Sequence, residues 1–168
     1  GANAGPLSGA LIVTRDLDNL KRIYVDGVGL TLEGPLPATR ATIDAQRRLW
    51  RMPPGMSWQA WRLTRPTLPD AIRVLVLVPD VDTPVMRRSY EREEAGPYAL
   101  GFAMRDVRAA DARITALGFK RTLPAVNEYP LKLRDGTEYP VIEASYEIAD
   151  ATRLVLMSAY PDREFRRL

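Results

Sequence analysis

The stretch ALGFAMRDVRAADARITALGF, residues 99–119, decides the fold, because it repeats GALIVTRDLDNLKRIYVDGVGL, residues 9–30. Arg15-Asp16-Leu17 aligns with Arg105-Asp106-Val107 at an offset of 90. Gly29-Leu30 then aligns with Gly118-Phe119 at an offset of 89. Similarity at a nearly fixed offset is the mark of a duplicated structural unit.

A second pair of segments matches in the same order along the chain. PDAIRVLVLV, from Pro69, resembles ADATRLVLMS, from Ala149, at an offset of 80. Its apolar run Val74–Leu77 aligns with Leu154–Met157. Two matched segments in the same order predict two copies of one unit of roughly 80 residues.

Each copy begins with a short apolar strand followed by a helix. In the first copy the strand Ala10–Thr14 leads to Asp16, a residue type that favours helix N-caps. Apolar residues then recur at helical spacing, and Gly29 ends the helix. The later apolar runs of each copy alternate as strands do, and Asp135-Gly136 predicts a tight hairpin. We therefore expect an α+β fold of two βαβββ modules.

The predicted domain boundaries follow from these copies. We expect a flexible leader at 1–8, a first module at 9–85, a charged linker at 86–97, a second module at 98–161 and a C-terminal tail at 162–168. The first module carries a helical insertion at about 36–52, bounded by prolines. The insertion is either structural padding or a cap over a pocket, because long insertions are often functional.

Composition excludes several kinds of chemistry. The chain has neither Cys nor His, so thiolate catalysis, Ser-His-Asp triads and zinc ribbons cannot occur within it. The net charge is +3, with basic and acidic residues interspersed, so no nucleic-acid partner is expected. No apolar run is long enough to span a membrane, and no signal peptide is recognised at the start. We expect a cytoplasmic protein.

With its repeated strand–Asp–helix–Gly pattern and its Asp-Ala-x-Arg strands, the chain resembles the vicinal oxygen chelate superfamily. That superfamily includes glyoxalase I, the extradiol dioxygenases and the bleomycin resistance proteins. The resemblance covers nearly the whole chain. It implies that the two modules pair so that their curved sheets form a half-open cup, with the helices outside and the ligand within. It also favours a homodimer.

The resemblance implies metal ligands on the first and last strand of each module. In this chain those positions fall on Gly9, Leu75, Ala99 and Val155, none of which can donate an electron pair to a metal. We therefore predict a member without the metal site and without a cofactor. Glyoxalase and dioxygenase chemistry would need a carboxylate site built elsewhere, for example from Glu143 or Glu147.

Strand alternation predicts which residues line the cup. The candidates for ligand binding are Trp61, Arg73, Leu75, Ala99, Gly101, Ala103, Arg153, Val155 and Met157. The small residues of the strand from Ala99 either leave volume open for a flat apolar group or pack against a bulky side chain such as Trp61. Arg73 and Arg153 either clamp an anion or pair with nearby acids. Trp58 and Trp61 point to opposite faces, so at most one lines the cup.

Glu143 is a candidate for a catalytic base, and its position in the strand pattern equally fits a residue that faces solvent. Tyr98, Tyr129 and Tyr139 could each supply a phenol. The leading hypothesis is a metal-independent protein that binds a small aromatic or anionic molecule. The alternatives are a metal-free acid–base enzyme of lyase or isomerase type, a glyoxalase- or dioxygenase-like enzyme with a displaced carboxylate metal site, and an interaction subunit without a small ligand.

Overall fold

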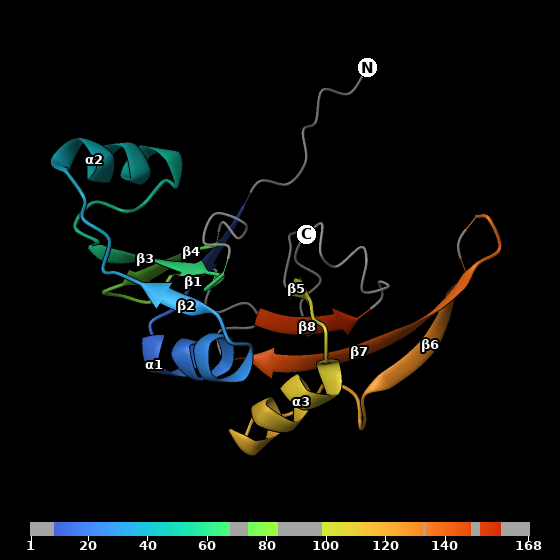
Figure 1. Ribbon diagram of the computed structural model, residues 1–168. Helices are drawn as coiled ribbons and strands as arrows, with labels where there is room; N and C mark the ends of the chain where they lie inside the picture. Colours follow the sequence, from blue (N-terminus) through green and yellow to red (C-terminus); the bar gives the residue numbers. More distant parts are fainter. Residues whose placement is uncertain (1–8, 68–73, 84–98, 133, 149–151, 159–168) are drawn as a thin grey trace. The chain divides into compact units, whose positions relative to one another are not determined.

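The computed structural model describes residues 9–67, 74–83, 99–132, 134–148 and 152–158, with Ala99 and 152–158 described by their backbone (Figure 1). Contacts divide the chain into two compact units. One holds residues 1–25 and 29–87, and the other holds residues 26–28 and 88–168. We call them the first and the second module. The leader, the linker and the tail expected from the sequence lie outside the described residues.

The sheet of the first module has the strand order β1-β4-β3-β2. Its strands are β1 (Ala10–Val13), β2 (Thr31–Glu33), β3 (Trp58–Thr64) and β4 (Val74–Pro79). β1 pairs with β4 in parallel, and the other two pairings are antiparallel. Strands adjacent in sequence are therefore not always neighbours, because β1 lies beside the last strand of its module.

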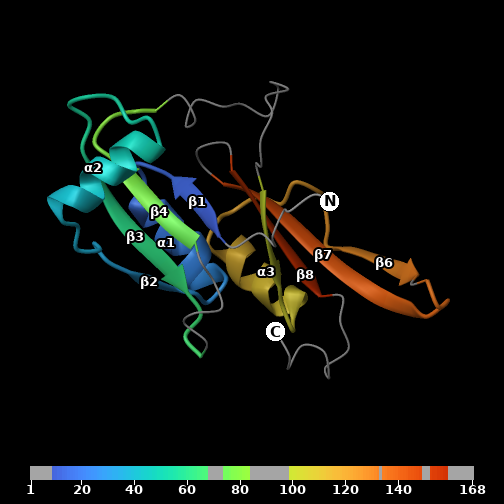
Figure 2. The same cartoon turned by 90° about the horizontal axis from the view of Figure 1, so that it is seen from above.

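The helical segment after β1 covers one face of this sheet (Figures 1 and 2). α1 (Leu17–Lys21) begins at Asp16, whose side chain accepts the backbone N–H of Asn19, and continues as the π-helical turn η1 (Arg22–Gly27). The register places the buried residues Ile12 and Val76 on the same face of neighbouring strands. They form the core with Leu20 and Ile23, both buried.

The insertion of the first module forms α2 (Arg40–Leu49), which lies on the side of the sheet opposite α1 (Figures 1 and 2). Arg47 attaches this helix to the start of β3. Its guanidinium donates to the carbonyl oxygens of Pro53 at 2.6 Å and Met56 at 2.9 Å. It also lies 5.0 Å from the ring centroid of Trp58, whose indole N–H donates to Oε1 of Gln46 at 3.0 Å.

The second module repeats this topology with the strand order β5-β8-β7-β6. Its strands are β5 (Ala99–Ala103), β6 (Asn127–Lys132), β7 (Glu138–Ile148) and β8 (Thr152–Ser158). β5 pairs with β8 in parallel, and β6–β7 and β7–β8 are antiparallel. Between β6 and β7 the side chain of Asp135 accepts the N–H of Thr137 at 2.9 Å.

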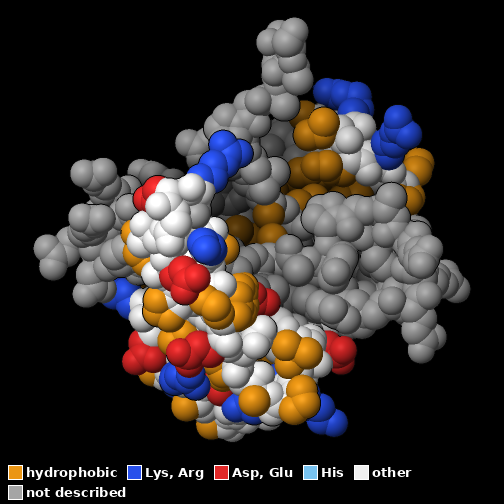
Figure 3. Space-filling model, turned by 90° about the vertical axis from the view of Figure 1, so that its right-hand side faces the viewer, with side chains coloured by type: hydrophobic (Ala, Val, Ile, Leu, Met, Phe, Trp, Pro, Cys, Tyr) orange, Lys and Arg blue, Asp and Glu red, His pale blue; other side chains and the backbone are white. Residues whose placement is uncertain are grey.

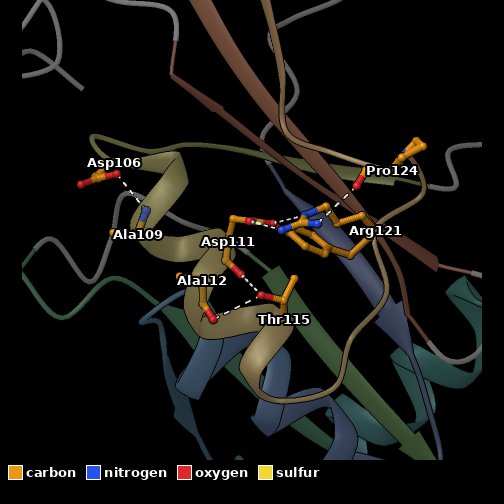
Figure 4. A network of polar contacts seen from close by, with 8 residues as sticks. Asp106, Ala109, Asp111, Ala112, Thr115, Arg121 and Pro124 are labelled. Carbon is orange, nitrogen blue, oxygen red and sulfur yellow. Dashed lines mark hydrogen bonds and ion pairs between the residues drawn. The ribbon is translucent and has the colours of Figure 1, made fainter.

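α3 (Val107–Ala116) packs on β7 and β8. Its buried Val107, Ala110 and Ile114 meet the sheet at helical spacing. A polar network also joins helix and sheet (Figure 4). Asp111 accepts the Tyr146 hydroxyl at 2.7 Å and two N–H groups of Arg121 at 2.7 and 2.6 Å. The even-numbered residues of central β7 therefore face α3.

The two modules share details that only a duplicated unit explains. Asp106 caps α3 through the backbone N–H of Ala109 at 2.9 Å, as Asp16 caps α1. Leu11 is paired with Leu75 and Gly101 with Val155, and these two pairs are equivalent under the sequence repeat. Gly29 and Gly118 both have positive φ, of 90° and 92°, after their helices. The α+β class with two βαβββ modules is confirmed.

Candidate ligand-binding face

We call the sheet face turned away from α1 or α3 the cup face of its module. In the second module the cup face consists of the odd-numbered residues of β5, β7 and β6, because the even-numbered residues of β7 face α3. The register arranges them in rows. One row is Gly101–Val155–Ser145, and the next is Ala103–Met157–Glu143–Asn127. Ala99 and Arg153 occupy the row of Glu147.

This face is open at its edge strand β5. A Cβ built on Gly101 meets no heavy atom within 4 Å, and both Gly101 and Ala103 are exposed. The sequence left two explanations for these small residues, namely open volume or close packing against a bulky side chain such as Trp61. Within the described part of the chain, the surroundings of Gly101 favour open volume.

Glu143 lies on the same face, one strand beyond β8, and is half-buried. Its Oε2 accepts the hydroxyl of Tyr129 at 2.8 Å. Tyr129 is reached diagonally, since Glu143 pairs directly with Asn127. The hydrogen bond to Glu143 and, to a smaller extent, burial raise the pKa of Tyr129. The phenol therefore keeps its proton at neutral pH and acts as a donor.

Two hydroxyl groups extend this polar strip. The side-chain oxygens of Ser145 and Thr122 are hydrogen-bonded to each other, and the N–H of Thr122 donates to the carbonyl oxygen of Ser145 at 2.8 Å. The second cup face thus has a small, open side on β5 and a hydrogen-bonding side on β7 and β6. Such an arrangement can hold a flat group and orient its polar substituent.

The cup face of the first module has a different character. Leu11 is 41% exposed and pairs with the half-buried Leu75. Beside Leu75 on β3, Arg62 donates to the carboxylate of Glu33 at 2.6 Å. In this ion pair the charges of Arg62 and Glu33, on β3 and β2, neutralise each other.

The two tryptophans of β3 lie on opposite faces, as their spacing predicts. Trp61 pairs with Val76, so it shares the face of Ile12 and α1, and its ring packs over Gly34. Trp58 pairs with Pro79 and lies on the cup face under α2. The register therefore shifts the expected lining tryptophan from Trp61 to Trp58, because pairing with β4 sets the absolute face.

The remaining candidates are placed only in part. Arg73 lies outside the described residues. Arg153, Val155 and Met157 lie on β8, where Arg153 is the strand partner of Glu147. The hydrogen bond between Tyr129 and Glu143 is the feature that sequence reasoning missed. The register of β6 against β7 brings the two residues together.

Figure 3 shows the distribution of charge on one side of the molecule. Basic, acidic and apolar side chains lie among one another over the lower part of this view, whereas apolar and basic side chains gather at its upper right. Among the residues that the structure describes, no three acidic side chains gather as metal ligands would. No helix in the described ranges is long and apolar enough to cross a membrane.

Comparisons with known proteins identify the architecture. No family model matches the sequence, and no curated protein matches it. A glyoxalase family protein from Bacillus cereus superposes with a TM-score of 0.63 at 16% identity, covering 96% of this chain and 99% of that one. A glyoxylase/bleomycin resistance protein/dioxygenase domain from Frankia sp. EAN1pec superposes with a TM-score of 0.60 at 14% identity, covering 99% and 100%.

A third solved structure, a glyoxalase/dioxygenase from Nostoc punctiforme, gives a TM-score of 0.51 at 12% identity over 96% of this chain and 99% of that one. Identities this low establish the fold and leave the activity open. With its duplicated βαβββ modules, the chain has the fold of the glyoxalase/bleomycin resistance/dioxygenase proteins, that is, the vicinal oxygen chelate fold.

Proposed function

We propose that the protein binds a small, ring-bearing molecule without a metal, on the cup face of its second module. The observation that carries this proposal is the open space beside Gly101, next to the exposed Ala103. A missing side chain on the edge strand β5 leaves room for a flat apolar group, and ligand sites are mostly apolar with a few placed polar groups.

The proposed lining combines the described and the undescribed candidates. It consists of Leu75, Ala99, Gly101, Ala103, Val155 and Met157, with Trp58 in place of Trp61. Arg73 and Arg153 stay candidates for holding an anionic group of the ligand. A homodimer remains a prediction from the resemblance, and sedimentation analysis measures it.

Metal independence is part of the proposal and rests on residue identity. Leu75 pairs with Leu11 on the cup face, at a place where metal-using members are expected to carry a ligand. Gly9, Ala99 and Val155 occupy the other three expected places. Neither glycine nor an aliphatic side chain can ligate a metal. A displaced carboxylate site, the basis of the glyoxalase-like alternative, would have to use groups away from these four positions.

The test of binding is Gly101→Val, which fills the open space with a branched side chain. The probe is 3-methylindole, followed by ligand-observed NMR. We expect the wild-type protein to bind it and Gly101→Val to lose at least about tenfold in affinity through steric exclusion. The control is Glu138→Val, which places the same side chain at an exposed position of β7 on the face opposite the cup face. Equal binding by all three proteins would overturn the proposed position.

The test of metal independence is elemental mass spectrometry after incubation with manganese, iron, nickel or zinc and desalting. We expect no metal to remain at one equivalent per chain. Retention of one equivalent would restore lyase or dioxygenase chemistry as the leading function.

A metal-free acid–base enzyme is the second candidate, and the hydrogen bond between Tyr129 and Glu143 is the observation that favours it. A carboxylate and a protonated phenol side by side can remove and return a proton. This function predicts exchange of a carbon-bound proton of the ligand with deuterated water, abolished in Glu143→Gln. A pure binding protein predicts no such exchange.

A further inference from the structure

The charges of the second cup face are unequally distributed. Among its described side chains on β5, β6 and β7, the charged ones are Glu143 and Glu147. Glu147 pairs across the ladder with Arg153, a residue of opposite charge. Glu143 pairs with Met157 on one side and Asn127 on the other, so its row contains no cation.

Among the described residues, Tyr129 is the hydrogen-bond partner of Glu143. The carboxylate accepts the Tyr129 hydroxyl through Oε2, and no described cation forms an ion pair with it. A carboxylate offers about four acceptor sites, so the described contacts leave room for a further donor. A half-buried carboxylate has lost part of its hydration, and a cationic group that contacts it restores the lost stabilisation.

The position of Glu143 matches the open side of the face. It stands two strands from Ala103, which at the usual strand spacing is about 10 Å. A bicyclic ring lying over Gly101 and Ala103 would reach Glu143 with a short side chain. Tyr129 holds the carboxylate in place from the far strand, because its pKa is raised and it remains a donor.

We infer that Glu143, oriented by Tyr129, is the polar anchor of the second cup face and selects a ligand whose ring carries a protonated amine. This inference rests on the proposed function, because it assumes that a ring occupies the open side at Gly101. It gives the ligand a cationic end at β7, whereas Arg73 and Arg153 would favour an anionic one. Tyr129 serves as a positioning residue.

Three probes with one ring test the inference. Tryptamine carries an amine, indole-3-acetate a carboxylate, and 3-methylindole neither group. We expect the wild-type protein to bind tryptamine roughly tenfold more tightly than 3-methylindole, since a charge-assisted hydrogen bond adds about that factor. Indole-3-acetate should bind more weakly than 3-methylindole because Glu143 repels it.

Glu143→Gln should remove the preference for tryptamine over 3-methylindole. The matched control is Glu138→Gln, which removes the same charge from the same strand at an exposed position of opposite parity. It should retain the preference. Tyr129→Phe should keep the preference for the amine and reduce it by a few-fold, because the carboxylate loses its orienting donor.

The outcomes separate this inference from the proposed function. Absence of binding by all three probes at millimolar concentration would refute both. Binding of the ring with a preference for indole-3-acetate would overturn the amine and leave ring binding intact. A preference for tryptamine that survives in Glu143→Gln would also overturn the inference, since another carboxylate would then be the anchor.

Discussion

Replacing Asp111 tests how α3 is attached to its sheet. Asp111 is 6% exposed and accepts hydrogen bonds from the Tyr146 hydroxyl and from two nitrogens of Arg121 (Figure 4). Asp111→Ala removes the acceptor of all of them. The consequences for the two donors differ, because Tyr146 is fully buried, whereas the side chain of Arg121 is 31% exposed.

The expected loss of stability follows from this difference. The guanidinium of Arg121 can recover water, so its lost bonds cost about 1–2 kcal/mol. The Tyr146 hydroxyl cannot reach water and is left unsatisfied, at a cost of about 1–3 kcal/mol. These losses and the small cavity left by the substitution should together lower the free energy of unfolding by about 3 kcal/mol. This value is in the range for breaking a buried charged pair.

Urea unfolding followed by circular dichroism at pH 7 measures this loss. Glu128→Gln is the control, because it breaks the Arg108–Glu128 ion pair of the same module, whose side chains are 57% and 55% exposed. It should cost less than about 1 kcal/mol. If Asp111→Ala costs no more than Glu128→Gln, the network does not hold α3 in place and the reasoning fails.

The pH dependence provides a second readout of the same group. Hydrogen bonds from Arg121, and secondarily from Tyr146, hold the pKa of Asp111 below its usual value despite its burial. A carboxyl with a depressed folded-state pKa contributes stability that is present above its unfolded value, near 3.9, and lost as the pH falls through the folded value. The difference between wild type and Asp111→Asn should be constant from about pH 7 to 5 and shrink below about pH 4.

Four further predictions concern other parts of the chain. Burial, together with the hydrogen bond to Asp111, raises the pKa of Tyr146. The free energy of unfolding, measured by urea titration at alkaline pH, should therefore be constant up to about pH 10 and fall above it. The fall should be less steep in Tyr146→Phe. Gly34→Ala should lower the free energy of unfolding by about 2 kcal/mol, because its Cβ would lie 2.7 Å from Cε3 of Trp61. Gly55→Ala, with positive φ but no neighbour within 4 Å, isolates the backbone contribution, and equal losses would contradict the clash. Arg47→Ala should speed the amide hydrogen exchange of residues 40–49 at least about tenfold, because the helix loses two hydrogen bonds to carbonyl oxygens. The control Arg48→Ala, at an exposed position, should not change the exchange. Equal exchange in the two variants would show that Arg47 does not attach α2. Glu143→Ala should change the free energy of unfolding by less than about 1 kcal/mol, measured in urea, and a larger loss would make Glu143 a structural residue.

The local features of the fold could be predicted because they depend on short stretches of sequence. Asp16 and Asp106 cap their helices as predicted, since an N-cap needs only its own side chain and the next turn of backbone. The offsets of 90 and 80 also align Leu11 with Gly101 and Leu75 with Val155, and the structure pairs these residues equivalently in the two modules, as Leu11–Leu75 and Gly101–Val155. A repeat aligns equivalent residues without any knowledge of the space between them.

The candidate site could be predicted only in part, because register is a property of two strands together. Alternation separates Trp58 from Trp61 but does not say which one shares a face with Leu75. A two-residue Asp135-Gly136 loop would have paired Tyr129 with Ile142. The observed turn pairs Tyr129 with Val141, which puts it diagonal to Glu143 on one face. A shift of one residue reverses the face of a whole strand.

The comparison of the two copies explains why selectivity should be sought in the second module. Leu77 and Met157 are equivalent in the repeat, and their neighbours across the ladder are Ala60 and Glu143. Equivalent positions on the helix faces stay apolar, as Ile12 and Phe102 do, because packing restricts them. On the cup face, the small buried Ala60 of the first module corresponds to Glu143 of the second. Among the described residues, Glu143 has no cationic partner. Packing does not require such an acid, whereas the inferred contact with a cationic ligand would.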